Sequence, residues 1–195
     1  MKKVSLGGMI AGMMMVATSV SFTGCLTDDK DDEPASTTKT ALAAEMTIAA
    51  GAQGATLGSV LDLDAGVALG SVAANAAQES IDLVFMYYGG SFHVDNAVSA
   101  KAAGVANSIN LTNSYSDSKI KDIGIVKVMT KPANQEAAKA AFTAGTPIKS
   151  SVITGGEMFL VKTTEGKLAL VTVGTIVGTD NKANAEFKVT INTIP

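Results

Sequence analysis

Residues 158–192, MFLVKTTEGKLALVTVGTIVGTDNKANAEFKVTIN, contain the clearest secondary-structure pattern in the chain. Residues 158–163 and 168–177 are apolar on both faces of an extended chain, and a tight turn at Glu165-Gly166 separates them. Residues 185–192 alternate between apolar and polar side chains, which is typical of a strand with one buried face. The stretch therefore predicts three antiparallel strands in a meander, with residues 168–177 in the middle.

Further strand patterns lie upstream of this meander. They cover residues 56–64, 81–88 and 123–129. The three leucines of residues 56–64 fall on one face of the expected strand. Apolar side chains occur on both faces of residues 81–88, which indicates a strand that is covered on both sides.

The helix patterns are short. Ser71 is a candidate N-cap for a helix over residues 72–78, and Asn134 is one for residues 135–142. Residues 96–106 are rich in Ala and are also expected to be partly helical. Strands with a few short helices between them predict an α+β domain with an antiparallel, β-rich sheet. A β-sandwich with helical decorations is the alternative fold.

Composition limits the function classes. The chain has 195 residues, of which 47% are hydrophobic, so it can bury the core of one domain. Its net charge is −3 and all 15 basic residues are Lys, which argues against a protein that binds nucleic acid. The single Cys excludes a disulfide framework and a multi-cysteine metal site.

The amino terminus has the layout of a secretory signal peptide over residues 1–24. Lys2 and Lys3 provide positive charge, residues 4–16 are apolar, and residues 17–24 are smaller and more polar. The apolar segment is about 13 residues long, whereas a membrane-spanning helix needs about 20. We therefore expect cleavage rather than a permanent membrane span.

The segment Phe22-Thr23-Gly24-Cys25 resembles a bacterial lipobox, with Phe22 where Leu is usual and Thr23 where Ser or Ala is usual. The resemblance implies that the Cys25 thiol is diacylated and that the chain is cut before it. Each buried methylene contributes about 0.8 kcal/mol, so two or three acyl chains would hold the protein in the lipid bilayer. An uncleaved amino-terminal anchor with an incidental cysteine is the alternative.

Residues 25–40 are expected to form a flexible acidic tether, and residues 41–195 a single β-rich ectodomain. The tether carries an acidic tract, residues 28–33, that is interrupted only by Lys30. This tract is similar to the export signal of surface-exposed lipoproteins in Bacteroidota. The resemblance implies an outer-membrane lipoprotein exposed at the cell surface; an orientation facing the periplasm is the alternative.

One aromatic cluster is a candidate ligand-binding site. Tyr87, Tyr88, Phe92 and the only histidine, His93, flank Gly89-Gly90, and some of these rings could stack on a sugar or a porphyrin. We expect Tyr87 to pack inward. The chain has no Gly-x-Ser-x-Gly motif for a catalytic triad and too few metal-ligand residues near His93, so we expect no catalytic or metal role for it.

Three carboxylates, Asp62, Asp64 and Asp82, could be neighbours across adjacent strands, as a glycan-cleaving enzyme would require. The chain has no Trp to furnish a carbohydrate cleft, so we expect a protein that is not an enzyme and that uses no cofactor.

Residues 61–66, 81–85 and 159–167 resemble surface lipoproteins of Bacteroidota and Fibrobacterota, and distantly the HmuY-type haem-capturing group. That group implies a β-rich ectodomain that holds haem through two histidines, of which this chain could supply only His93.

The primary expectation is therefore a lipoprotein anchored through acylated Cys25, with a non-catalytic binding or structural ectodomain. Its partner at the cell surface would be a protein or a glycan. Capture of a small, haem-like or glycan ligand through the Tyr87–His93 region is the alternative, and a glycan-active enzyme is the third hypothesis.

Overall fold

The structure is a computed structural model that describes residues 39–53, 55, 57–107 and 110–192. The predicted signal peptide, the lipobox residues Phe22, Thr23 and Gly24, the lipidation site Cys25 and most of the tether lie outside the described residues. The described residues all belong to one compact unit, Thr37–Pro195.

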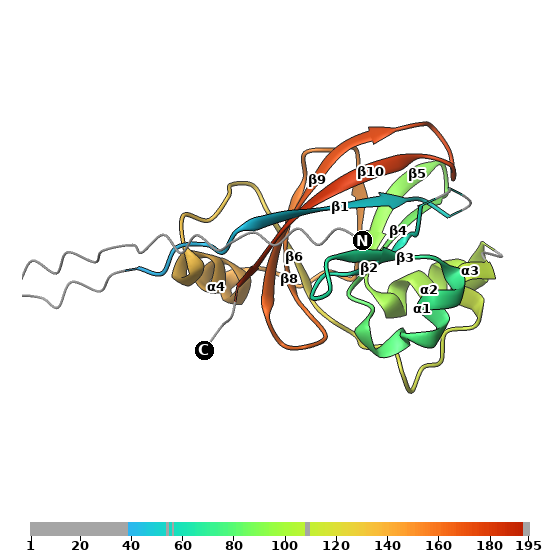
Figure 1. The fold of residues 1–195 in the computed structure, drawn as a ribbon, viewed down its shortest axis with the longest axis horizontal. Coiled ribbons are helices and arrows are strands. Elements are labelled where there is room, and N and C mark those ends of the chain that lie inside the picture. The colour runs from blue at the N-terminus through green and yellow to red at the C-terminus, as the bar shows by residue number, and fades with distance from the viewer. Residues whose placement is uncertain (1–38, 54, 56, 108–109, 193–195) are drawn as a thin grey trace, which may run out of the picture. The chain divides into compact units, whose positions relative to one another are not determined.

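Within the described residues, ten strands form two five-stranded sheets (Figure 1). The first sheet has the order β1 (Glu45–Gly51), β10 (Asn184–Asn192), β9 (Leu168–Val177), β8 (Met158–Lys162) and β6 (Ile125–Val128). The second has the order β3 (Val67–Leu69), β2 (Val60–Asp62), β4 (Leu83–Tyr88), β5 (Ser91–Asp95) and β7 (Ser150–Ile153). Their pairings are antiparallel, so the predicted antiparallel, β-rich α+β class is confirmed.

The predicted carboxyl-terminal meander is present. Strand β9 pairs with β8 on one side and with β10 on the other, with Val171 opposite both Phe159 and Val189. Gly166 has a φ of 87° in the turn between β8 and β9, where the Thr163 N–H donates to the Lys167 carbonyl at 2.8 Å. The turn at Glu165-Gly166 was therefore predicted correctly.

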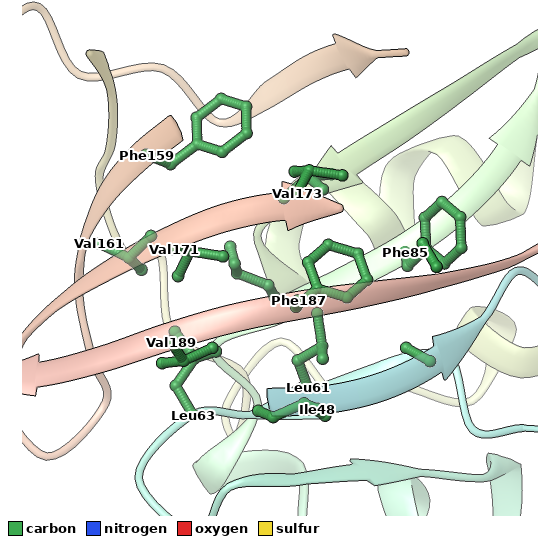
Figure 2. Close-up of a cluster of buried hydrophobic side chains, with 14 of the residues drawn as sticks. Ile48, Leu61, Leu63, Phe85, Phe159, Val161, Val171, Val173, Phe187 and Val189 are labelled. Atoms are coloured by element: carbon green, nitrogen blue, oxygen red, sulfur yellow. The ribbon is translucent and has the colours of Figure 1, made fainter. Parts of the chain in front are cut away.

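The two sheets pack against each other through a shared hydrophobic core (Figure 2). Phe85 on β4 and Phe187 on β10 meet edge to face, with ring centroids 5.5 Å apart, and both are fully buried. Leu61 comes from the second sheet and Val171 from the first, and both belong to the same cluster. Contacts of this kind between opposing sheet faces make the domain a β-sandwich.

Helices cover the outer face of the second sheet. Helices α1 (Ser71–Ala76) and α2 (Ala97–Ala106) supply buried alanines to a second cluster, which contains Val84 and Met86 of β4. The next residue along β4, Phe85, faces the opposite way into the central core. The prediction of a strand covered on both sides is therefore confirmed.

Helix α4 (Gln135–Ala144) covers part of the outer face of the first sheet, where Ala138 packs with Leu160 and Leu170. Two shorter helical segments, η1 (Gln78–Ser80) and α3 (Asn110–Asn113), complete the elements of the described chain. The result is a sandwich with helices outside both sheets, which combines the predicted α+β class with its β-sandwich alternative.

Two local predictions were wrong. Ser71 is not an N-cap: it is the first residue of α1, and Gly70 occupies the cap position without a side-chain hydrogen bond. The strand expected over residues 56–64 is limited to β2, and Leu57 is 42% exposed. A Cβ on Gly58 would lie 2.3 Å from the Leu69 carbonyl carbon, so the backbones of residues 58 and 69 approach each other too closely for any other residue.

The chain is attached to the domain from Thr40 onward. The Thr40 carbonyl accepts a hydrogen bond from the Gln135 N–H at 2.9 Å, and the Thr40 N–H donates to the Glu136 carboxylate at 3.1 Å. Nearby, the Ala43 N–H donates to Asn192 Oδ1 at 3.0 Å. These bonds join the segment before β1 to the start of α4 and to the end of β10.

Candidate functional site

The β4–β5 hairpin carries all four residues of the predicted ligand-binding cluster. Its two-residue turn consists of Gly89 and Gly90, with φ values of 60° and 80°, a conformation that suits glycine and the tight turn of a hairpin. The register places Tyr87 opposite Phe92, whereas His93 lies opposite Met86. Because side chains alternate between faces, the four residues are divided between the two faces of the sheet.

Tyr87 and Phe92 lie on the face that packs against the central core. Their ring centroids are 4.9 Å apart, and Phe92 also lies 5.8 Å from Phe85. The Tyr87 backbone N–H donates to Gln53 Oε1 at 2.7 Å, and Gln53 Nε2 donates to the Tyr87 carbonyl. The inward packing expected for Tyr87 is therefore confirmed, and the two rings contribute to the sandwich interior.

Tyr88 and His93 lie on the opposite face and form a polar cluster with two residues that were not predicted. The Tyr88 and His93 rings are stacked, with centroids 3.9 Å apart and planes inclined by 16°. The Tyr88 hydroxyl donates to Asp95 Oδ2 at 3.0 Å and lies 3.3 Å from Ser150 Oγ. We call Tyr88, His93, Asp95 and Ser150 the hairpin cluster.

Burial shifts the pKa values of three groups in the hairpin cluster. It raises the pKa of the fully buried Asp95 carboxyl, lowers that of His93 and raises that of Tyr88 to about 12. Tyr88 is therefore a hydroxyl donor at neutral pH. Among the described residues, Asp95 Oδ1 and His93 Nδ1 are buried and have no hydrogen-bond partner.

The hairpin cluster does not have the geometry of a hydrolase triad. In the described part of the chain, His93 makes no hydrogen bond to Ser150 or Asp95; its ring stacks on Tyr88. A triad requires the histidine to bond to the nucleophile on one side and to the carboxylate on the other. The cluster does contain two buried polar atoms without a hydrogen-bond partner in the described structure, Asp95 Oδ1 and His93 Nδ1.

Asp95 could have been found in the sequence by strand periodicity, because it lies two residues after His93 on the same face of β5. Ser150 could not have been found in this way. It joins the cluster only because β7 pairs with β5, which places Ser150 opposite Asp95.

The three acidic residues are also brought together, but their contacts are structural. Asp82 is fully buried, and its two carboxylate oxygens accept the N–H groups of Leu63 at 2.8 Å and of Thr164 at 2.7 Å. Burial, with a smaller contribution from the nearby charges of Asp64 and Asp62, raises the pKa of Asp82 to about 6, although the two backbone hydrogen bonds act in the opposite direction. Asp82 therefore links the end of β2 to the β8–β9 turn, which belongs to the other sheet.

The remaining two acids have partners of their own. Asp64 Oδ1 lies 3.2 Å from Lys167 Nζ, and Asp62 Oδ1 accepts the Ala65 N–H at 2.9 Å in the turn after β2. In the described ranges, no group of three or more His, Cys, Asp or Glu residues is placed to hold a metal ion. None of the helices in these ranges is long and apolar enough to cross a membrane.

The fold defines a class of protein: a two-sheet antiparallel sandwich with helices on both outer faces. No family model matches the chain, and the comparisons with curated proteins and with solved structures find no match.

Proposed function

We propose that the chain is a bacterial lipoprotein, anchored to the bilayer through acylated Cys25, whose sandwich domain is a non-catalytic binding or structural ectodomain. The observation that carries the proposal is the segment Phe22-Thr23-Gly24-Cys25, which follows a positive and then an apolar stretch. Cys25 is the only cysteine in the chain, so acylation would leave it no free thiol.

The position at which the domain begins supports a tethered arrangement. Thr40 is attached to α4, and the segment from Cys25 to Thr40 contains 40 − 25 = 15 residue steps. An extended chain spans at most about 3.6 Å per residue, so such a tether would reach about 50 Å. That length is enough to hold the domain clear of the lipid headgroups.

The acidic tract of residues 28–33 supports an outer-membrane lipoprotein exposed at the cell surface rather than one facing the periplasm. A cell-surface protein or glycan is then the partner class. A non-catalytic role is supported by the contacts of Asp82, the candidate catalytic carboxylate with a raised pKa. Both oxygens of Asp82 are held by backbone N–H groups, so the carboxylate is already engaged in the fold.

Capture of a small ligand at the β4–β5 hairpin is the second candidate function. It is favoured by the unpartnered Asp95 Oδ1 and His93 Nδ1 beside the Tyr88 ring, because a polar ligand group could satisfy them. His93 is the only histidine, so haem held by two histidines of this chain is not part of the proposal.

The test is expression of the wild type, Cys25→Ala and Phe22→Leu in a bacterium that acylates lipoproteins. We expect the wild type to incorporate radiolabelled palmitate and to sediment with the membranes, and Cys25→Ala to lose the label. Phe22→Leu restores the usual lipobox residue and serves as the matched control, with labelling equal to or greater than that of the wild type. A mature chain that begins at Met1, or a Cys25 thiol that reacts freely with maleimide, would contradict the proposal.

A further inference from the structure

A cavity of about 340 Å³ lies on the described part of the domain, separate from the hairpin cluster. Three segments border it: the residues just before β6, helix α4 and the β8–β9 turn. The residues that matter for its chemistry are Lys121, Ile123, Gly124, Phe142, Lys162 and Thr164. The volume falls at the lower end of the range of about 300–1,000 Å³ that is usual for small-molecule sites.

One part of the lining is apolar. Phe142 on α4 packs against the cluster beneath that helix, and Ile123 packs against the central core. Between them, Gly124 presents no side chain: a Cβ built there would lie 3.5 Å from the Pro147 Cβ and 3.9 Å from the Phe142 Cζ. The absence of a side chain at Gly124 leaves room beside the Phe142 ring.

The other part of the lining is positively charged. Lys121 Nζ donates to the Thr164 carbonyl at 2.9 Å, which is a neutral acceptor and leaves the ammonium charge uncompensated. Lys162 is exposed on β8. Among the described residues, neither lysine has a carboxylate within 4.0 Å, whereas Lys167, in the same hairpin, contacts both Asp64 and Glu165.

The one acidic residue of the lining is already engaged. Asp122 accepts hydrogen bonds from Lys149 Nζ and, at 2.9 Å, from Asn96 Nδ2. The Lys149 contact lowers the pKa of Asp122, so its carboxylate is charged and paired at neutral pH. Two ammonium groups therefore remain beside an apolar wall.

We propose that this cavity binds a small organic anion. The carboxylate or equivalent anionic group contacts Lys121 and Lys162, because charge-assisted hydrogen bonds to ammonium groups are the strong ones. The aromatic or aliphatic body of the ligand lies against Phe142 and Ile123 in the space beside Gly124. This inference deepens the binding role in the proposed function by naming a ligand class, and it does not require the lipid anchor.

The experiment is an NMR titration of the full-length protein in detergent with 1-naphthoate, which joins a carboxylate to a flat apolar body. We expect saturable shifts of the Gly124 and Gly166 amide signals. The uncharged analogue 1-naphthamide has the same flat apolar body but lacks the anion, and at equal free concentration outside the detergent micelles it should bind at least about tenfold more weakly.

Two variants locate the site. Lys121→Gln together with Lys162→Gln removes both charges at the surface and should weaken binding of 1-naphthoate by about tenfold or more, whereas Lys188→Gln, at an exposed position on β10, should leave binding unchanged. Gly124→Leu should fill the space beside Phe142 and abolish binding.

Three outcomes would overturn the inference: no localised amide shifts, equal affinity for the acid and the amide, or unchanged affinity in the double lysine variant. The double variant changes only surface side chains, so it remains informative even if Gly124→Leu fails to fold. Failure of this titration leaves palmitate labelling at Cys25 unaffected. Loss of labelling in turn leaves the titration intact, so the two proposals are tested separately.

Discussion

At the scale of single residues, Asp82 shows how a buried acid can be structural rather than catalytic. A carboxylate with a raised pKa beside other acids is a common signature of an active site. Here the same environment arises because Asp82 caps two backbone N–H groups, from Leu63 and Thr164, that would otherwise be buried without an acceptor. Its neighbours Asp62 and Asp64 are occupied by a turn and an ion pair.

Asp82 should make the stability of the fold depend on pH. Its folded pKa of about 6 lies above the ordinary value of 3.8, so between these values the folded protein holds a proton that the unfolded chain has released. The stabilisation is therefore fully present below about pH 4 and is lost as the pH rises through about 6, by about 3 kcal/mol. Urea unfolding at pH 4 and pH 7 should show this change in the wild type relative to Asp82→Asn, which lacks the titrating group. Parallel pH curves for the two proteins would contradict this role.

At the scale of elements, two asparagines cap helix N-termini in the same way but differ in their other hydrogen bonds. Asn96 Oδ1 accepts the Ser99 N–H at the start of α2, and Asn134 Oδ1 accepts the Ala137 N–H at the start of α4, each at 2.8 Å. Asn96 is fully buried, and its Nδ2 also donates to Asp122 and to the Ile123 carbonyl. Asn96 thus joins α2 to the segment that leads into β6.

The two caps therefore predict different costs on truncation. Asn134→Ala should lower the free energy of unfolding by about 1 kcal/mol, the usual value of an N-cap. Asn96→Ala removes a cap and also leaves the part-buried Ile123 carbonyl without this donor, so it should cost about 2–4 kcal/mol. Asn96→Asp retains the cap acceptor but places a carboxylate beside Asp122, and it should also destabilise. Urea titrations measure the two changes in the free energy of unfolding. Equal decreases for Asn96→Ala and Asn134→Ala would show that the hydrogen bonds of Asn96 Nδ2 to Asp122 and Ile123 contribute nothing.

At the scale of the whole molecule, the central core makes the two sheets one folding unit. Each sheet buries the apolar side chains of its inner face against those of the other sheet (Figure 2). Phe187 and Phe85 make this contact from opposite sheets, and Asp82 adds a hydrogen-bonded link between them. Helices cover the outer face of the second sheet and part of the outer face of the first (Figure 1).

Truncation of Phe187 to Ala should therefore destabilise both sheets together. The change should cost about 3–5 kcal/mol, the range for deleting a buried aromatic ring. Far-ultraviolet circular dichroism and the near-ultraviolet tyrosine signal should still report one coincident transition. Val177→Ala, at a position 68% exposed on β9, is the control and should change stability by less than about 0.5 kcal/mol. Two separate transitions in the Phe187 variant would mean that the sheets fold independently.

Prediction succeeded where a strand carries its own signal. The bounds of β9 were predicted from a run that is apolar on both faces, and the structure buries both faces of that strand over residues 168–171. Strand β1 was not predicted from the sequence. Met46, Ile48 and Ala50 form its inward face, but the exposed residue between the last two is Ala49, which weakens the apolar–polar alternation. Strands β3 and β7 are only three and four residues long, and each has an exposed valine. Their sequences therefore carry no clear strand pattern, and they are recognised as strands only by their pairing with β2 and β5.

The sequence by itself determined the antiparallel meander, the cap at Asn134 and the glycine turns, because each depends on neighbours within a few residues. Tertiary structure alone decided the division of the aromatic cluster between two sheet faces, the placement of Ser150 beside Asp95, and the cavity beside Gly124. These features join segments that are distant along the chain. Their geometry is set by how the sheets and helices pack, a property that local periodicity does not encode.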